Sequence, residues 1–565
     1  MLLFNILLRF ICWLLSLLRP TASTVKLGGT TLKGLDLPRL GLEFFGGIPF
    51  AEPPLGKLRF SPPVLKTTYG VASFDASKFG AACLQPTVSL LPSGPNHTPV
   101  NLHCLTISIL RPAGLTKDAA LPSMVFLHGG GFLMGASSQY NGSAIVTHSM
   151  KRGTPILYVT FNYRLGPFGF PQGKEAASRQ SLNLGLKDQL AALQWMQEHI
   201  SAFGGDRTKV TLFGESAGAI SIADLYFNAQ LETYIRGAIF QSGGPATTIV
   251  FDPERRESEW ETFVRAVPDC AFTLDAESPE TFPCMQGASS RDLLRALNVA
   301  TRDIPEQFPW VPTIDGELLP ELPSNLLAKG TFSNIPYISG TTLDEATFFV
   351  WPYIDSEEAI IHHLLSNFSN SPETRTALEK AAERLFELYP DVPALGCPFN
   401  TGNETFGLSS QYKRSSAMYG DIMFQSQRRA WMQATSSKGV KSYGYLLTDA
   451  PPDESPPIIV PEMDSGRLGV YHGLELYYIY GVLPELNSPA ASVTLGTQMM
   501  DYWISFATSL DPNDGLGSER PAWPAYTSGN QLLLQLEASN TTSIPDDYRE
   551  EQIAFLNARS HLFRH

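Results

Sequence analysis

The sequence predicts an α/β protein built on a large, mostly parallel central sheet that is flanked by helices. Short apolar runs alternate with longer amphipathic segments along the chain, as expected for strands joined by crossover helices. Residues 210–219 read as a buried strand, an abrupt glycine-containing turn and the start of a helix. No internal repeat or low-complexity linker divides the sequence, so we expect one large domain.

The expected strands and the clearest helix follow one another in chain order. The apolar runs predict strands at residues 124–127, 156–161, 210–213, 238–241, 336–339 and 442–447. A helix is predicted over residues 184–199, where four apolar side chains recur at helical spacing: Leu186, Leu190, Leu193 and Met196. Gly204-Gly205-Asp206 ends this helical stretch shortly before the strand at 210–213.

Composition and charge narrow the class of partner. The chain has 565 residues, of which 43% are hydrophobic and 17% charged, and this balance indicates a globular protein with a substantial core. The formal net charge is −14, which argues against a nucleic acid or an anionic membrane surface as partner. No feature of the sequence specifies an oligomeric state.

The first 23 residues differ in composition from the rest of the chain. Residues 1–18 are nearly all apolar, and Thr21-Ala22-Ser23 offers small residues for cleavage, so we expect a signal peptide. An uncleaved anchor is the alternative, but the stretch is short for a membrane span and contains Arg9. The prediction is a signal peptide at 1–23 followed by a secreted domain at 24–565, without stable membrane insertion once the leader is removed.

Two further patterns agree with export. Outside the leader, Asn-x-Ser/Thr acceptors for glycosylation occur at five positions: Asn96, Asn141, Asn367, Asn403 and Asn540. Five cysteines also lie outside the leader, and an oxidising compartment favours the local disulfides Cys83–Cys104 and Cys270–Cys284, with Cys397 left over. The alternative is five reduced cysteines in the core.

Two glycine-rich turns carry the chemistry of an acyl-transfer site. Residues 214–218 have the Gly-x-Ser-x-Gly pattern of a nucleophile elbow, which exposes the hydroxyl of Ser216 on a strained turn. This pentapeptide alone is weak evidence, because it also arises by chance as an ordinary glycine turn. A second cluster, His128-Gly129-Gly130-Gly131, follows the strand at 124–127 and matches the loop that donates backbone N–H groups to an oxyanion. Together the two turns predict a serine nucleophile beside an oxyanion hole.

Longer motifs give the chain a specific resemblance. They are FGGIPFAEPP at 45–54, NYR at 162–164, NLGLKDQ at 183–189, FGGD at 203–206 and QSGG at 241–244. With these motifs the chain resembles the type-B carboxylesterase/lipase family, α/β-hydrolases that include fungal lipases and cholinesterases. The similarity runs from about residue 25 to the segment ending at Trp523-Pro524, nearly the whole mature chain.

The resemblance implies roles for residues that periodicity cannot assign. The acid of the family triad matches Glu345, in the pair Asp344-Glu345, and the base matches His472. Their order after Ser216 is the chain order of this fold. As alternatives, an Asp-Glu pair is usually a solvated turn, and a lone histidine is more often structural. Ala346 stands where the family often has glycine.

Other implied roles surround this triad. The oxyanion hole is expected from the backbone N–H groups of Gly130, Gly131 and Ala217. Glu215 and Glu475 resemble a pair of buried family carboxylates and are expected to support the histidine. The resemblance implies ester hydrolysis through an acyl-enzyme on Ser216, with neither a metal nor an organic cofactor.

Departures from relatives bear on the substrate, which is expected to be a small-molecule or lipid-like ester. The loop between Cys83 and Cys104 corresponds to the lid of the lipases and is short, which favours an esterase over an interfacial lipase. It contains no aromatic residue, so specificity for a quaternary ammonium group is not expected. Phe308 and Trp310 lie where the family builds its acyl pocket; the alternative is that both are core aromatics.

Two other classes of function remain open at this point. The same triad can transfer an acyl group to an alcohol or amine, or release a thioester, in a biosynthetic pathway. The fold also supports non-catalytic binding modules, but these usually lose a triad residue, whereas Ser216, Glu345 and His472 are all present.

Overall fold

The structure is a computed structural model that describes residues 23–86, 100–275, 280–304, 306–369, 371–450 and 465–565. Residues 1–22 of the predicted leader and the acceptor Asn96 lie outside the described residues. Among the helices in the described part of the chain, none combines the length and apolar character that crossing a membrane requires.

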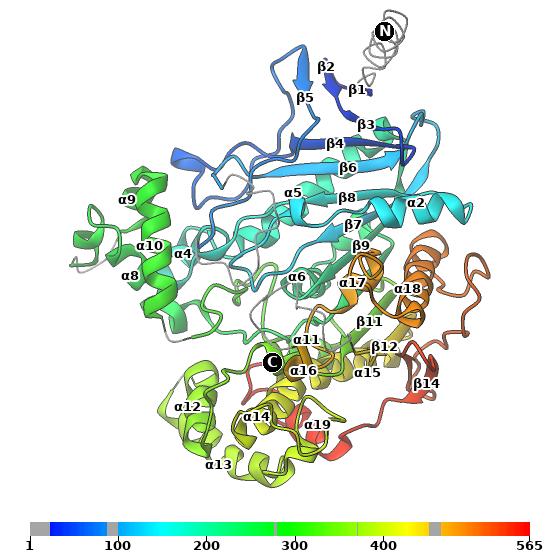
Figure 1. The fold of residues 1–565 in the computed structure, drawn as a ribbon. Helices are drawn as coiled ribbons and strands as arrows, with labels where there is room; N and C mark the ends of the chain where they lie inside the picture. Colours follow the sequence, from blue (N-terminus) through cyan, green and yellow to red (C-terminus); the bar gives the residue numbers. More distant parts are fainter. Residues whose placement is uncertain (1–22, 87–99, 276–279, 305, 370, 451–464) are drawn as a thin grey trace, which may run out of the picture.

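An eleven-stranded sheet forms the centre of the molecule (Figure 1). Its order is β14-β13-β12-β11-β10-β9-β7-β8-β6-β4-β3. The strands are β3 (Leu35–Leu37), β4 (Leu42–Pro49), β6 (Thr106–Pro112), β7 (Leu121–Leu127), β8 (Leu157–Phe161), β9 (Gly205–Glu215), β10 (Gly237–Gln241), β11 (Tyr337–Thr342), β12 (Ser442–Leu447), β13 (Leu532–Leu536) and β14 (Thr542–Pro545). Neighbours from β8 to β13 pair in parallel, whereas the outer pairs at both edges are antiparallel. The predicted α/β fold with a large, mostly parallel sheet is confirmed.

A second, three-stranded sheet lies near the amino-terminal end of the described chain. It contains β1 (Thr24–Leu27), β2 (Thr30–Lys33) and β5 (Ser73–Asp75). The α-helices are α2 (Ser143–Lys151), α3 (Gly166–Gly169), α4 (Gly173–Ser178), α5 (Leu184–His199), α6 (Ala217–Leu225), α7 (Leu231–Tyr234), α8 (Glu257–Arg265), α9 (Phe282–Gly287), α10 (Ser290–Asp303), α11 (Pro323–Lys329), α12 (Glu357–Phe368), α13 (Pro372–Leu388), α14 (Ser410–Gly420), α15 (Ser426–Ser437), α16 (Ser465–Leu468), α17 (Glu475–Ile479), α18 (Ala490–Ser509) and α19 (Glu550–Asn557).

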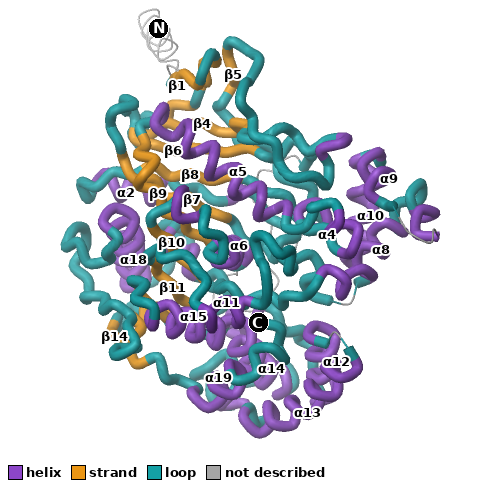
Figure 2. Tube along the Cα trace, turned by 180° about the vertical axis from the view of Figure 1, so that it is seen from behind, coloured by secondary structure: helices purple, strands orange, loops and turns teal. Residues whose placement is uncertain are grey.

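Helices cover both faces of the large sheet because its strands are apolar on both sides. Along β7, Val125 and Leu127 join the core cluster that contains α5 and α6, and Met124 and Phe126 join the cluster that contains α17 and α18. Side chains that alternate between two buried faces are expected for a central parallel strand. Figure 2 shows α5 and α6 across the face opposite to that of α2, α17 and α18.

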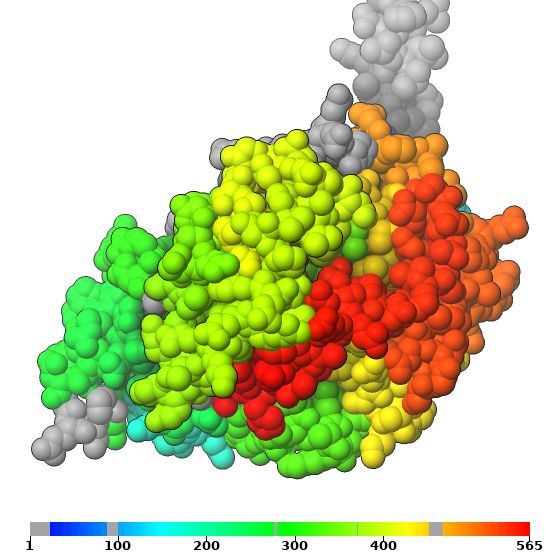
Figure 3. All heavy atoms as spheres, turned by 90° about the horizontal axis from the view of Figure 1, so that it is seen from below, coloured from blue at the N-terminus to red at the C-terminus, as the bar shows by residue number. Residues whose placement is uncertain are grey.

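A third apolar cluster lies below the sheet and joins α12, α13, α14 and α19. In the view from below (Figure 3), the C-terminal residues in red lie against the yellow-green helices of this cluster. The cluster includes Phe424, a residue that also contacts the candidate catalytic histidine. This apolar cluster therefore extends from the lower helices to the candidate catalytic histidine.

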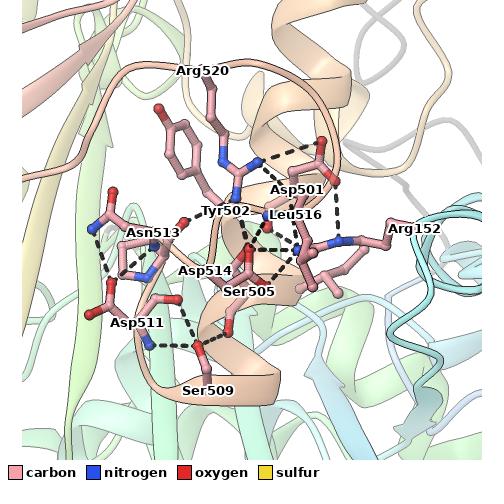
Figure 4. Close-up of polar contacts among 12 residues, drawn as sticks. Arg152, Asp501, Tyr502, Ser505, Ser509, Asp511, Asn513, Asp514, Leu516 and Arg520 are labelled. Carbon is pink, nitrogen blue, oxygen red and sulfur yellow. Dashed lines mark hydrogen bonds and ion pairs between the residues drawn. The ribbon is translucent and has the colours of Figure 1, made fainter.

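A buried ion-pair network fastens α18 to α2 (Figure 4). Arg152, at the end of α2, donates from one guanidinium nitrogen to both carboxylate oxygens of Asp514, at 2.8 and 2.6 Å. Asp501 of α18 is fully buried and accepts from the backbone N–H and the hydroxyl of Ser518. Arg520 also donates to Asp514, at 3.3 Å. The network holds the turn after α18 against α2.

The predicted disulfides are both present. Cys83 bonds to Cys104 and Cys270 bonds to Cys284, and Cys397 is a free, buried thiol.

The glycosylation predictions differ in their outcome. Asn141, Asn403 and Asn540 are exposed, so they stay candidate acceptors. Asn367 is only 8% exposed within α12, so burial makes it the least favourable of the four acceptors among the described residues. Its side-chain amide donates to the carbonyl of His363 at 2.9 Å, which holds the side chain along its own helix.

Candidate active site

The candidate nucleophile stands on a sharp turn between β9 and α6. Ser216 has φ +54°, the left-handed region that costs energy for a residue with a side chain, and its N–H donates to the carbonyl of Gln241 at 2.9 Å. A Cβ added to Gly214 would lie 2.7 Å from the carbonyl carbon of Gly218. A Cβ on Gly218 would lie 2.1 Å from the carbonyl oxygen of Leu127. Glycine is therefore required at both positions of the predicted elbow.

The candidate acid and base form a tight pair. Glu345 opens the short helix η6 (Glu345–Phe348) after β11, and its Oε2 lies 2.6 Å from Nδ1 of His472. Its other carboxylate oxygen accepts from the backbone N–H of Thr342 at 2.8 Å. The imidazole packs against the rings of Phe349 and Phe424, with centroid separations of 4.8 and 5.0 Å. These contacts fix the ring and leave Nε2 as the nitrogen available for other chemistry.

The sequence did not indicate that Asp344, the neighbour of Glu345, also has a role at this site. Asp344 is buried, and one of its carboxylate oxygens accepts from the N–H of Val470, two residues before His472, at 2.8 Å. The other accepts from the N–H of Phe399 at 2.8 Å. Asp344 therefore anchors the loop of the histidine, while Glu345 contacts the imidazole itself. The sequence showed only that two acidic residues are adjacent. It did not indicate that one of them contacts the imidazole and the other holds the loop.

One cavity of about 2550 Å³ collects the residues predicted from distant parts of the chain. Its wall includes Ser216, Ala217, His472, Gly130 and Gly131. Pockets for single drug-sized ligands are typically about 300–1,000 Å³, so this cavity has room for a large substrate.

The two aromatic residues predicted for the acyl pocket lie in different environments. Phe308 lines the cavity, where its ring carbon would lie 2.8 Å from a Cβ on Gly131. Trp310 is not part of the cavity wall; it is 1% exposed and packs against Phe263 with ring centroids 6.0 Å apart. Trp310 therefore has the environment of a core aromatic, which was the alternative, and its place in the acyl pocket stays a prediction.

The glycine loop leaves bare backbone on the cavity wall. Gly130 has φ +108° and Gly131 has φ +60°, conformations that favour glycine. A Cβ on Gly130 would lie 2.1 Å from the carbonyl oxygen of Met134, so no side chain fits there. Ala217 is the first residue of α6, where backbone N–H groups lack helical partners. These three positions suit the donors of an oxyanion hole.

Buried carboxylates control the charge of the imidazole. Burial raises the pKa of Glu215 to about 7 and that of Glu475 to about 8, and mutual repulsion among the carboxylates adds to both shifts. Burial alone lowers the pKa of His472, but the charges of Glu215 and Glu345 outweigh it and raise that pKa to about 9. Glu215 Oε1 lies 3.1 Å from Nε2 without forming a hydrogen bond, and Glu475 accepts from Ser242. Both predicted supporting residues thus lie beside the pair.

The fold and this site together define a class. A mixed sheet with helices on both faces, a strand–serine–helix elbow, and an acid and histidine following later strands in that order are the features of an α/β-hydrolase. The comparisons narrow the class further. A model of the carboxylesterase family matches residues 21–556, and the chain belongs to this family of carboxylic ester hydrolases.

Curated relatives cover almost the whole chain. It is 32% identical to the secreted triacylglycerol lipase LIP1 of Gibberella zeae, over 96% of this chain and 91% of that protein. It is 32% identical to lipase 1 of Geotrichum candidum, over 92% of this chain and 93% of that protein. It is 29% identical to the liver carboxylesterase of Sus scrofa, over 93% of this chain and 90% of that protein.

Solved structures agree on the fold. EstA of Aspergillus niger superposes with a TM-score of 0.79, covering 96% of this chain and 99% of that chain at 24% identity. A thermophilic pNB esterase superposes with a TM-score of 0.75, covering 95% of this chain and 100% of that chain at 29% identity.

Proposed function

We propose that this chain is a secreted serine hydrolase that cleaves carboxylic esters through an acyl-enzyme on Ser216. The observation that carries the proposal is the 2.6 Å contact between Glu345 and His472, whose imidazole lines a cavity that Ser216 and the glycine loop also line. Family membership supports the reaction class, because the relatives include lipases and a carboxylesterase.

In the proposed mechanism, Nε2 of His472 takes the proton of Ser216 as the serine oxygen attacks the ester carbonyl. Glu345 holds the imidazole through Nδ1 and stabilises the imidazolium that forms. The N–H groups of Gly130, Gly131 and Ala217 stabilise the oxyanion. The imidazolium then protonates the leaving alcohol, and water, deprotonated by the same histidine, releases the acid and restores Ser216.

An esterase is proposed in preference to an interfacial lipase, because the segment between Cys83 and Cys104 is short. Two of the relatives are named as lipases, so an interfacial lipase is the alternative to test. Incubation with a fluorophosphonate probe is expected to label wild-type protein on Ser216, and p-nitrophenyl esters of increasing acyl length are expected to be hydrolysed below their solubility limit. A sharp rise in activity once a triglyceride forms an emulsion would overturn the preference for an esterase.

Acyl transfer and thioester release stay as the second candidate, since the same acyl-enzyme can be captured by an alcohol or amine. Product analysis with added acceptors separates the two. A non-catalytic module of this fold is the third reading, and an unlabelled protein in the fluorophosphonate assay would favour it.

Secretion is proposed with a leader at 1–23 and a single domain at 24–565. The disulfides Cys83–Cys104 and Cys270–Cys284 support an oxidising compartment, and the Gibberella zeae relative is named as secreted. Amino-terminal sequencing of protein recovered from the medium of an expression host is expected to start near residue 24.

The Glu215→Gln variant is expected to move the acid limb of the pH profile of kcat/KM to lower pH. The imidazole must be neutral to accept a proton, and the charge of Glu215 raises the pKa of His472. Removing that charge lowers the pKa, so the active form appears at lower pH, by about one unit or more. Rates across a pH series with a soluble ester measure the shift.

Glu475→Gln serves as the matched control. Glu475 contributes less to the charge around His472 and has a raised pKa itself, so its replacement is expected to give the smaller shift. An acid limb that stays in place or moves upward in Glu215→Gln contradicts the assigned coupling.

A further inference from the structure

A turn beside the active site exposes two stacked aromatic rings. Trp351 is 43% exposed and Tyr353 is 73% exposed. Their ring centroids lie 5.7 Å apart and the ring planes differ by 17°, a stacked arrangement. Exposed aromatic rings that lie together on a surface mark interaction sites more often than isolated ones do.

The turn is held in place from below. Val350 and Ile354, on either side of the exposed rings, are each 4% exposed and belong to the apolar cluster of the lower helices. The N–H of Val350 donates to the carbonyl of Ala346 at 3.0 Å, and the N–H of Ile354 donates to the carbonyl of Trp351 at 3.1 Å. The fold therefore buries the aliphatic side chains of this turn and presents its aromatic ones to solvent.

One of the two exposed rings, that of Trp351, is part of the wall of the catalytic cavity. Trp351 and Phe348 line the same cavity as Ser216 and His472. The ring of Phe348 lies 5.4 Å from that of Phe349, which in turn lies 4.8 Å from the imidazole. Aromatic side chains thus line this cavity both next to the catalytic histidine and at the exposed turn, where Tyr353 stacks on Trp351.

The charged side chains near the turn bear on the charge that a bound group can carry. The sequence from 330 to 374 contains neither lysine nor arginine, and Asp355 and Glu358 follow the aromatic pair closely. Glu357 also follows it, but this carboxylate is paired with Arg414 at 2.6 Å. Arg302, which lines another part of the cavity wall, is paired with Asp303. The carboxylates of Asp355 and Glu358 disfavour an anionic ring and an anionic lipid surface.

We propose that Trp351, which stacks on Tyr353 and lines the same cavity as Phe348, forms a subsite for a neutral aromatic ring carried by the ester substrate. Aromatic rings prefer stacked or edge-to-face contacts with each other, and such pairs are favourable beyond the area they bury. This inference rests on the proposed ester hydrolysis at Ser216 and adds a substrate class to it: esters with a phenyl-type group distant from the reacting carbonyl.

The test compares esters that differ only in whether their ring is aromatic. One series places the ring in the acid, as ethyl esters of ω-phenylalkanoic and ω-cyclohexylalkanoic acids. The other places it in the alcohol, as phenylalkyl and cyclohexylalkyl acetates. In the wild type we expect a higher kcat/KM for the phenyl member of at least one series. Trp351→Ala is expected to reduce that phenyl preference about three- to tenfold, through KM more than kcat.

Two variants control for general effects. Trp351→Phe keeps a ring and is expected to restore most of the preference. Phe272→Ala removes another exposed aromatic, 68% exposed and outside the cavity wall, and is expected to change neither series.

Three outcomes would overturn the subsite. They are an equal loss for phenyl and cyclohexyl esters in Trp351→Ala, a wild type without phenyl preference in either series, and an effect confined to emulsified substrate, which would indicate a lipid-surface contact. A wild type that hydrolyses no ester and is not labelled by a fluorophosphonate refutes the proposed function instead, so the two failures are distinguishable.

Discussion

Replacing Ser216 by alanine is expected to lower kcat on a soluble p-nitrophenyl ester by about a millionfold, as loss of a serine nucleophile does in other hydrolases. Alanine keeps the Cβ that the turn already accommodates at φ +54°, so the elbow is expected to keep its shape. The thermal unfolding temperature of the variant is therefore expected to match that of the wild type. Steady-state kinetics and a thermal melt measure the two quantities.

Ser242→Ala is the matched control for this substitution. Ser242 is also buried, follows the neighbouring strand β10 and has φ +53°, but its hydroxyl donates to Glu475. Its replacement is expected to cost far less activity than that of Ser216. If Ser216→Ala keeps more than about one percent of the wild-type kcat, a different residue supplies the nucleophile.

Gly130→Ala is expected to lower kcat by about a hundredfold or more, the usual cost of losing one oxyanion donor. A Cβ at this position would lie 2.1 Å from the carbonyl oxygen of Met134, whose own N–H donates to the carbonyl of Gly130. Because both contacts involve backbone, the loop has to move to admit the methyl group. The φ of +108° adds strain. We therefore expect a lower melting temperature as well.

Gly114→Ala separates the strain from the loss of the donor. Gly114 also has a positive φ, +74°, but a Cβ there would have no heavy atom within 4 Å. This control is expected to lose stability, about 1–2 kcal/mol, and to keep its kcat. If Gly130→Ala behaves in the same way, losing stability without losing kcat, the glycine loop does not serve the oxyanion.

Much of the central fold was predictable, because its elements follow from local patterns. The strand predicted at 442–447 and the helix predicted at 184–199 have those bounds in the structure, as β12 and α5. The strand predicted at 210–213 is longer, because β9 starts at Gly205. Residues 206–209 are polar and form an irregularity in the pairing with β7, between the pairs Gly205–Leu121 and Val210–Ser123, which local sequence does not encode.

The candidate site was predictable only in part. Ser216 and the glycine loop follow from turn chemistry, whereas Glu345 and His472 came from resemblance. The contacts of Phe424 with the imidazole and of Asp344 with the loop of the histidine join segments far apart in sequence, so no local pattern reveals them. Phe308 and Trp310 are two residues apart, yet Phe308 lines the cavity and Trp310 is buried in the core. Local sequence does not predict this difference.

The pair Asp344-Glu345 has a consequence for anyone who wishes to move this chemistry to another scaffold. Glu345 orients the imidazole, but Asp344 and Thr347 hold the loop that carries it, through Val470 and the carbonyl of Leu468. A design that copies only serine, glutamate and histidine would leave the imidazole on an untethered loop. The smallest portable unit is therefore the turn at 344–347 together with the loop at 468–472, transplanted as one block.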